Sequence, residues 1–154
     1  MNMHTKCSVL CFVFLAAFMC VTSASAQERV ANYSTGRAGT AGFEAFRFWV
    51  RDGQPAAVTY ISGSPAEVIE LKYAGPEAWR KSPAFKVQFL TGRTLYVVPQ
   101  WLTLRVTDGA KYSKVFRWQY EGPVNGRGTA CAPCANDARE AMQLIKAHFL
   151  SRRP

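Results

Sequence analysis

Between residues 44 and 120, hydrophobic and polar residues alternate in a series of short segments. In residues 44–50, for example, Phe46, Phe48 and Val50 occupy every second position. A two-residue period of this kind places the apolar side chains on one face of a β-strand. The same pattern predicts strands at residues 44–50, 56–61, 67–73, 85–89, 94–98, 101–106 and 113–120.

Turn-forming residues separate these predicted strands. Asp52-Gly53 and Asp108-Gly109 are typical of tight turns, because glycine tolerates a positive φ. Pro99 cannot donate a hydrogen bond within a sheet and should therefore end a strand. About six to seven strands at this spacing predict a mainly β (α+β) domain with a curved antiparallel sheet, sandwich- or barrel-like.

A single amphipathic helix is predicted near the C-terminus, at about residues 137–149. Met142, Ile145 and Phe149 follow a helical period, and Asp137-x-x-Glu140 has the spacing of a capping box. We expect the apolar side of this helix to pack on the sheet. Residues 151–154 form a polar tail.

The N-terminal segment has the layout of a secretory signal peptide. Lys6 precedes an apolar run that is too short for a comfortable transmembrane helix, and Ala24-x-Ala26 offers a cleavage site. Residues 1–26 are therefore expected to be cleaved, which leaves a periplasmic or secreted product with no transmembrane segment. Residues 27–42 are rich in glycine and are expected to be a flexible lead-in to a single domain over residues 43–150.

The exported chain is strongly basic. The full chain carries 19 Lys and Arg residues against 10 Asp and Glu residues. Loss of Lys6 with the signal peptide leaves a formal charge of +8. Such a charge favours anionic partners, and in an exported protein these are an anionic envelope component or an acidic protein. The expected location argues against nucleic acid.

Cys131-Ala132-Pro133-Cys134 is the most distinctive motif of the mature chain. Export implies an oxidising compartment, so a Cys131–Cys134 disulfide is expected. The favoured interpretation is a structural clip, because closing so short a loop stabilises a fold by only about 2 kcal/mol. The alternative is a thiol–disulfide oxidoreductase in which Cys131 is the nucleophile, activated by the helix N-terminus, and Cys134 the resolving thiol. The βαβ pattern that accompanies a redox motif is missing from the sequence.

No metal or cofactor is predicted. Zinc requires about four ligands, whereas the mature chain offers two cysteines and one histidine, His148. Ala135 stands where a haem-attachment motif requires histidine. His148, alone on a helix, is expected to serve in surface or edge packing and not as a catalytic base.

A basic and aromatic outer face is the second candidate site. If Phe46 and Phe48 point inward, the alternation places other side chains outward on the same and neighbouring strands: Arg47, Trp49, Trp101, Arg105 and Arg117. Exposed Trp and Arg side chains suit a glycan ring, a lipid head group or an acidic protein. The favoured alternative is a two-sided core in which Trp49 and Trp101 pack beneath the helix.

The sequence contains no convergent catalytic set. It has neither a Gly-x-Ser-x-Gly elbow nor a phosphate-binding glycine-rich loop, and the carboxylates do not form an obvious pair. We therefore predict a small, exported, non-catalytic binding or accessory protein of the cell envelope, of the inhibitor, immunity or assembly-accessory type. The oxidoreductase hypothesis remains the alternative.

Overall fold

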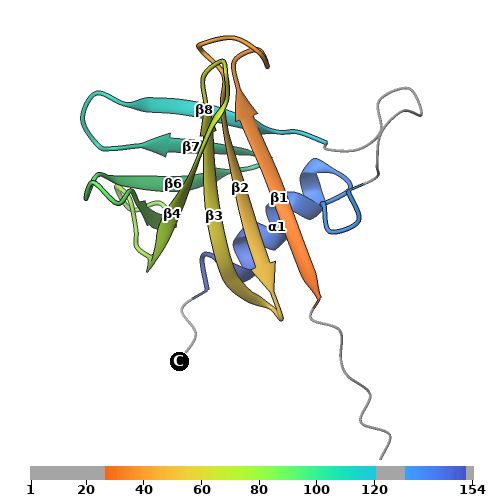
Figure 1. Ribbon diagram of the computed structural model, residues 1–154. Helices are drawn as coiled ribbons and strands as arrows, with labels where there is room; N and C mark the ends of the chain where they lie inside the picture. Colours follow the sequence, from red (N-terminus) through yellow and green to blue (C-terminus); the bar gives the residue numbers. More distant parts are fainter. Residues whose placement is uncertain (1–26, 121–130, 152–154) are drawn as a thin grey trace, which may run out of the picture.

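The computed structural model describes residues 27–120 and 131–151. Each strand pairs antiparallel with the next, and the last strand pairs back with the first, so that the sheet closes into a barrel with one helix against it (Figure 1). The elements are β1 (Glu28–Thr35), β2 (Glu44–Arg51), β3 (Gln54–Ser62), β4 (Glu67–Pro76), β5 (Phe85–Gln88), β6 (Thr94–Gln100), β7 (Thr103–Thr107), β8 (Ser113–Trp118) and α1 (Ala138–His148).

The predicted fold class is confirmed, with one more strand than expected. The additional strand is β1, in residues that the sequence analysis assigned to a flexible lead-in; that assignment is wrong. Ala31 and Tyr33 point into the barrel and are fully buried, while Asn32 and Ser34 are buried on the outer side. The alternation of apolar and polar residues is weak because both faces of β1 are covered. The predicted signal peptide, residues 1–26, and the end of the predicted tail, residues 152–154, lie outside the described residues.

Side chains fill the interior of the barrel. One inner row runs through Ala31, Phe48, Val58 and Leu71, which are cross-strand partners on four successive strands and are at most 3% exposed. In a barrel of eight strands the interior is just wide enough for such packing. The interior is therefore a hydrophobic core, and the binding chemistry must be sought on the outside or at the ends.

α1 lies across the end of the barrel at which β1 starts and β2 ends, behind β1 and β2 in Figure 1. Glu140 in its first turn forms an ion pair with Arg29 of β1. In its last turn, His148 Nδ1 lies 2.9 Å from the carbonyl oxygen of Gly53, in the β2–β3 turn. The side chains that α1 buries against the barrel are Ala141, Met142, Leu144 and Ile145, followed by Phe149 just beyond the helix. The helix thus closes one end of the core.

Within the described part of the chain, no helix has the length and apolar character needed to cross a membrane.

Candidate binding surface

Arg105 and Arg117 lie on the outer face of neighbouring strands, as the alternation predicts. Arg105 of β7 is the cross-strand partner of Val115, and Arg117 of β8 is the partner of Thr103. The two arginines are therefore on adjacent strands, offset by two residues. Both side chains are exposed. Neither has an ion-pair partner among the residues that the structure describes. Arg105 Nε donates a long hydrogen bond of 3.4 Å to Gln100 Oε1, which leaves its terminal nitrogens for an anion.

Trp101 lies beside these arginines, at the tip of the β6–β7 hairpin. Gln100 pairs with Thr103, which leaves Trp101 and Leu102 as the two turn residues. Trp101 is 85% exposed and has a φ of 50°. The interpretation that Trp101 packs beneath the helix is therefore wrong. That interpretation assumed that the helix covers a face of the sheet. Because the sheet closes into a barrel, α1 covers an open end instead and leaves Trp101 exposed.

Arg47 and Trp49 also face outward, but on β2. β1 and β2 are paired throughout, with Asn32 opposite Arg47 and Val30 opposite Trp49. β1 consequently separates both residues from Arg117 on β8. Trp49 is half-buried on this outer side of the sheet. The structure thus brings together three of the five predicted binding residues and places the other two across β1.

One further exposed apolar side chain belongs to the same surface. Val115 is 42% exposed next to Arg105. Sequence parity could have identified Val115, which shares the outward side of its strand with Arg117. We call this surface the arginine–aromatic face; it consists of Trp101, Arg105, Val115 and Arg117.

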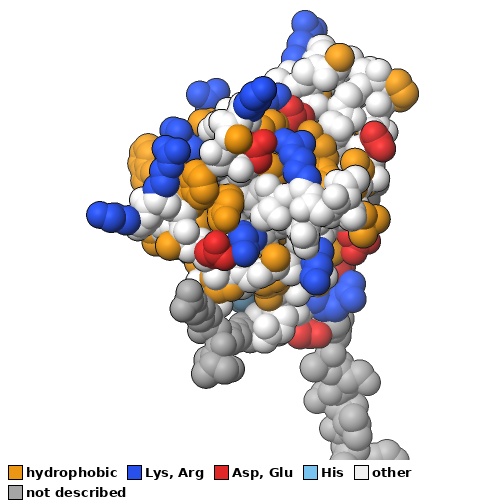
Figure 2. Space-filling view, turned by 90° about the vertical axis from the view of Figure 1, so that its left-hand side faces the viewer, with side chains coloured by type: hydrophobic (Ala, Val, Ile, Leu, Met, Phe, Trp, Pro, Cys, Tyr) orange, Lys and Arg blue, Asp and Glu red, His pale blue; other side chains and the backbone are white. Residues whose placement is uncertain are grey.

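The acidic side chains of the protein are largely engaged elsewhere. Five of the carboxylates that the structure describes form ion pairs: Glu28 with Arg51, Glu44 with Lys114, Glu77 with Lys86, Asp108 with Arg93, and Glu140 with Arg29. The outward-facing residues of β5 to β8, all of them described, include no carboxylate. In Figure 2, Lys and Arg side chains are spread over the visible side with exposed hydrophobic side chains between them. The excess positive charge is therefore left at the surface.

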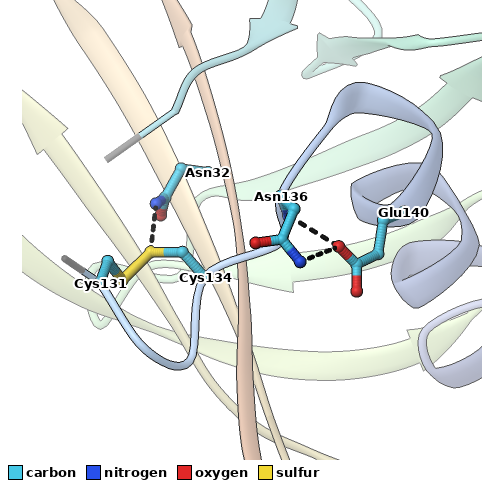
Figure 3. The surroundings of a disulfide bond; sticks show 5 residues. All are labelled: Asn32, Cys131, Cys134, Asn136 and Glu140. Atoms are coloured by element: carbon cyan, nitrogen blue, oxygen red, sulfur yellow. Dashed lines mark hydrogen bonds between the residues drawn. A yellow bond between two sulfur atoms is a disulfide. The ribbon is translucent and has the colours of Figure 1, made fainter. Parts of the chain in front are cut away.

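The Cys131–Cys134 disulfide is present and lies at the seam of the barrel (Figure 3). β8 pairs with β1 at only two positions, Tyr33 with Trp118 and Ser34 with Arg117. The disulfide segment continues this edge, because Val30 N donates to the carbonyl oxygen of Pro133 and Ala135 N donates to that of Val30, at 2.8 and 2.9 Å. The disulfide thus holds the conformation of a segment that completes the closure of the sheet.

The surroundings of the disulfide favour this structural role. Cys134 is 4% exposed, and Asn32 Nδ2 donates to its sulfur at 3.5 Å. The helix begins four residues after Cys134, and the side chain of its N-cap Asp137 accepts hydrogen bonds from the backbone N–H groups of Arg139 and Glu140, both at 2.8 Å. These are the donors that would activate a thiolate at a helix N-terminus, and here they are already occupied.

Glu140 also differs from the expected capping box. Its carboxylate accepts hydrogen bonds from the backbone and side-chain nitrogens of Asn136, at 2.7 and 3.0 Å (Figure 3). The Asn136 backbone hydrogen bond, and then Arg29, hold the pKa of Glu140 below its usual range. Glu140 therefore joins the disulfide segment, the helix start and β1.

A polar cluster lies inside the opposite end of the barrel. Glu44, 8% exposed, accepts a hydrogen bond of 2.5 Å from the Tyr112 hydroxyl and forms an ion pair with Lys114. Burial alone raises the pKa of Glu44, but the contacts with Lys114, Tyr112 and Tyr60 lower it below its usual range. Burial and the neighbouring Glu44 raise the pKa of Tyr60 to about 12. The cluster is mutually satisfied and ties together β2, β3 and β8.

A shallow groove of about 620 Å³ lies where α1 meets the β2–β3 turn. His148 lines it and is held by Gly53, which agrees with the edge-packing role predicted for this residue. Across residues 27–120 and 131–151, no three or more His, Cys, Asp or Glu side chains are grouped in a way that could hold a metal ion.

Comparisons with known proteins find no matching family model, no matching curated protein and no matching solved structure. The function is therefore argued from the residues of this chain and their geometry.

The disulfide yields a first testable prediction. Replacing both cysteines, Cys131→Ser with Cys134→Ser, should lower the free energy of unfolding by about 2 kcal/mol, the value for closing a very short loop. Hydrogen exchange should increase most in β1, where Val30 is bonded to this segment. Thermal unfolding and hydrogen exchange measure the two effects. A reductant should produce the same two effects in the wild-type protein and change nothing in the variant. Equal protection of β1 from exchange in the two proteins would contradict the role of the disulfide segment in closing the sheet.

Proposed function

We propose that this chain is a small, exported, non-catalytic binding protein that recognises an anionic polymer of the cell envelope through the arginine–aromatic face. The signal-peptide pattern supports a periplasmic or secreted location, and the disulfide is consistent with an oxidising compartment. The observation that carries the proposal is the conformation of Trp101 beside Arg105 and Arg117.

The backbone of Trp101 argues that its side chain serves a purpose other than folding. A positive φ is rare for a bulky residue and costs roughly 1–2 kcal/mol, whereas glycine adopts it freely. With 85% of its surface exposed, the Trp101 side chain gains little burial to offset this cost. Strained residues of this kind concentrate at functional sites. We infer that the indole is kept for contact with a partner.

The chemistry of the face suits a polymer that carries both sugar rings and anionic groups. An exposed indole offers a flat apolar surface against which a sugar ring can stack. Arg105 and Arg117 can each donate paired hydrogen bonds to a carboxylate, sulfate or phosphate. The outward-facing strand residues of β5 to β8 include no carboxylate, and Glu77, which reaches over Lys86 and Tyr96, is paired with Lys86. The net charge around Arg105 and Arg117 therefore attracts a polyanion.

Binding of heparin and of long-chain polyphosphate tests the proposal. The Arg105→Gln and Arg117→Gln double variant should weaken both interactions about tenfold and reduce the slope of log Kd against log salt by about two, since two counterion-releasing contacts are lost. Trp101→Gly should weaken the binding of heparin, which has sugar rings, more than that of polyphosphate. The same variant should raise the free energy of unfolding by about 1 kcal/mol, because glycine relieves the strained φ. Titration calorimetry and thermal unfolding measure these effects.

The controls are matched in charge and in exposure. Arg37→Gln with Lys72→Gln removes two exposed cations from the β1–β2 connection and from β4, and Leu90→Ala truncates a 95% exposed apolar residue on another hairpin tip. All three substitutions should leave Kd within about twofold of the wild-type value, because they lie away from the face. If the control pair weakens binding as much as the arginine pair, attraction is non-specific and the proposed site is wrong. If neither probe binds, the polymer is excluded and the acidic-protein partner takes its place.

A further inference from the structure

A second exposed turn carries two cations in an unfavourable backbone conformation. Trp79 and Ser82 exchange backbone hydrogen bonds of 2.9 and 2.8 Å, so that Arg80 and Lys81 are the two central residues of a tight turn. Their φ values are 45° and 70°. Two positive φ values are the signature of a type I′ turn, in which Asn-Gly is strongly preferred. Arg and Lys are therefore unfavourable for the backbone at these two positions.

This turn rests on the outer side of β6. The ring of Trp79 lies 4.6 Å from that of Tyr96, and Arg80 lies over Trp79 at 5.3 Å. Gly109, in the β7–β8 turn, leaves the space for this contact, because a Cβ atom there would come within 2.6 Å of the Trp79 ring. Trp79 thus forms a platform that presents the Arg80 and Lys81 side chains on the same side of the barrel as the arginine–aromatic face.

The strand register connects the two features. Arg117 lies one strand and two residues from Arg105, and Arg105, opposite Val98, lies one strand and two residues from Tyr96. With strands about 5 Å apart and two residues spanning about 7 Å, each step covers roughly 8 Å. Arg117, Arg105 and the Trp79 platform above Tyr96 are therefore evenly spaced along one diagonal of the outer surface. Trp101, at the tip of the β6–β7 hairpin, lies to one side of the Arg117 end of this diagonal, and Arg80 with Lys81 lie at the other end.

We propose that an extended polyanion lies along this diagonal and contacts the Arg80–Lys81 turn as a second binding element. The inference rests on the proposed function and adds that the ligand is a long chain, not a single anionic group. The arginine–aromatic face holds one part of the polymer and the Arg80–Lys81 turn holds another. A ligand shorter than the diagonal reaches one element alone.

The test replaces the turn by the sequence that its backbone prefers, with Arg80→Asn and Lys81→Gly. The thermal midpoint should rise by several degrees, because the new residues favour positive φ. Affinity for long heparin should fall about tenfold, and the slope of log Kd against log salt should decrease by about two. Affinity for a heparin-derived disaccharide should stay unchanged. The charge-matched control is the Arg37→Gln and Lys72→Gln pair.

The outcomes separate this inference from the proposed function. If the Arg105→Gln and Arg117→Gln pair weakens binding of long heparin but the turn variant binds it as tightly as the wild type, the diagonal is wrong and the face alone stands. An equal loss for the disaccharide and the long polymer also overturns the diagonal. If wild-type protein binds neither heparin nor polyphosphate of any length, the proposed function and this inference both fail. Loss of long-polymer affinity together with a raised thermal midpoint supports the inference, because misfolding cannot produce that combination.

Discussion

Replacing Phe149 by alanine is expected to lower the free energy of unfolding by about 3–5 kcal/mol, the usual cost of deleting a fully buried aromatic side chain. Phe149 is fully buried, and its ring lies 5.6 Å from that of Phe48, 5.2 Å from that of Tyr73 and 5.2 Å from that of Phe85. These rings belong to β2, β4 and β5, so one residue after the helix joins three strands. Denaturant unfolding measures the loss.

Two milder variants at the same place serve as controls. Phe149→Leu keeps most of the buried volume and should cost about 1–1.5 kcal/mol. Tyr73→Phe removes the hydroxyl that donates to the carbonyl oxygen of Phe149 at 2.8 Å and should cost about 1 kcal/mol. A loss below about 1 kcal/mol for Phe149→Ala would mean that the barrel retains its core without the helix, and the account of α1 as the closure of one end would be wrong.

The strands and the helix could be predicted because their signals are local. The alternation of Phe46, Phe48 and Val50 depends only on which face of β2 is buried, and all three residues are in the core. The helix carries its own start signal, since Asp137 caps the first turn as its spacing suggested. The closure of the sheet depends instead on contacts distant in sequence. One edge of β1 pairs with β2. The other edge pairs with β8 and with the segment that contains Cys134, both more than 80 residues away in the sequence.

The same distinction between local signals and distant contacts explains which parts of the candidate site could be predicted. Strand parity identified Arg105 and Arg117 as outward, and the register of β7 and β8 brings them together. Parity also placed Trp101 outward, and Trp101 is exposed, but its exposure has another cause, because a turn residue does not belong to either face of a strand. It also grouped Arg47 and Trp49 with the others, since a sequence pattern gives the face of each strand but not the order of strands around a barrel. The Arg80–Lys81 turn gave no sequence signal, because Arg and Lys are not typical of positive φ.

Replacing Glu44 by glutamine is expected to lower the free energy of unfolding by about 2–3 kcal/mol near neutral pH. The carboxylate is almost completely buried and faces the Lys114 ammonium group and the Tyr112 hydroxyl. A neutral amide leaves Lys114 without its counter-charge and turns a charged hydrogen bond into a weaker neutral one. Glu70→Gln, on the exposed outer side of β4, changes the same charge and should cost less than about 0.5 kcal/mol.

The pH dependence of this loss identifies its electrostatic origin. Because the folded protein holds the pKa of Glu44 below its usual range, the carboxylate stabilises the fold at pH values above the unfolded pKa of about 4.3. That contribution disappears as the pH falls through the lower folded pKa, where Glu44 is protonated in both states. The difference in stability between wild type and Glu44→Gln should therefore narrow over the interval in which the pH falls from about 5 to below the lowered folded pKa of Glu44. A difference in stability that stays constant over this interval would mean that the loss comes from packing and not from charge. The Glu44 cluster would then not contribute to closing this end of the barrel.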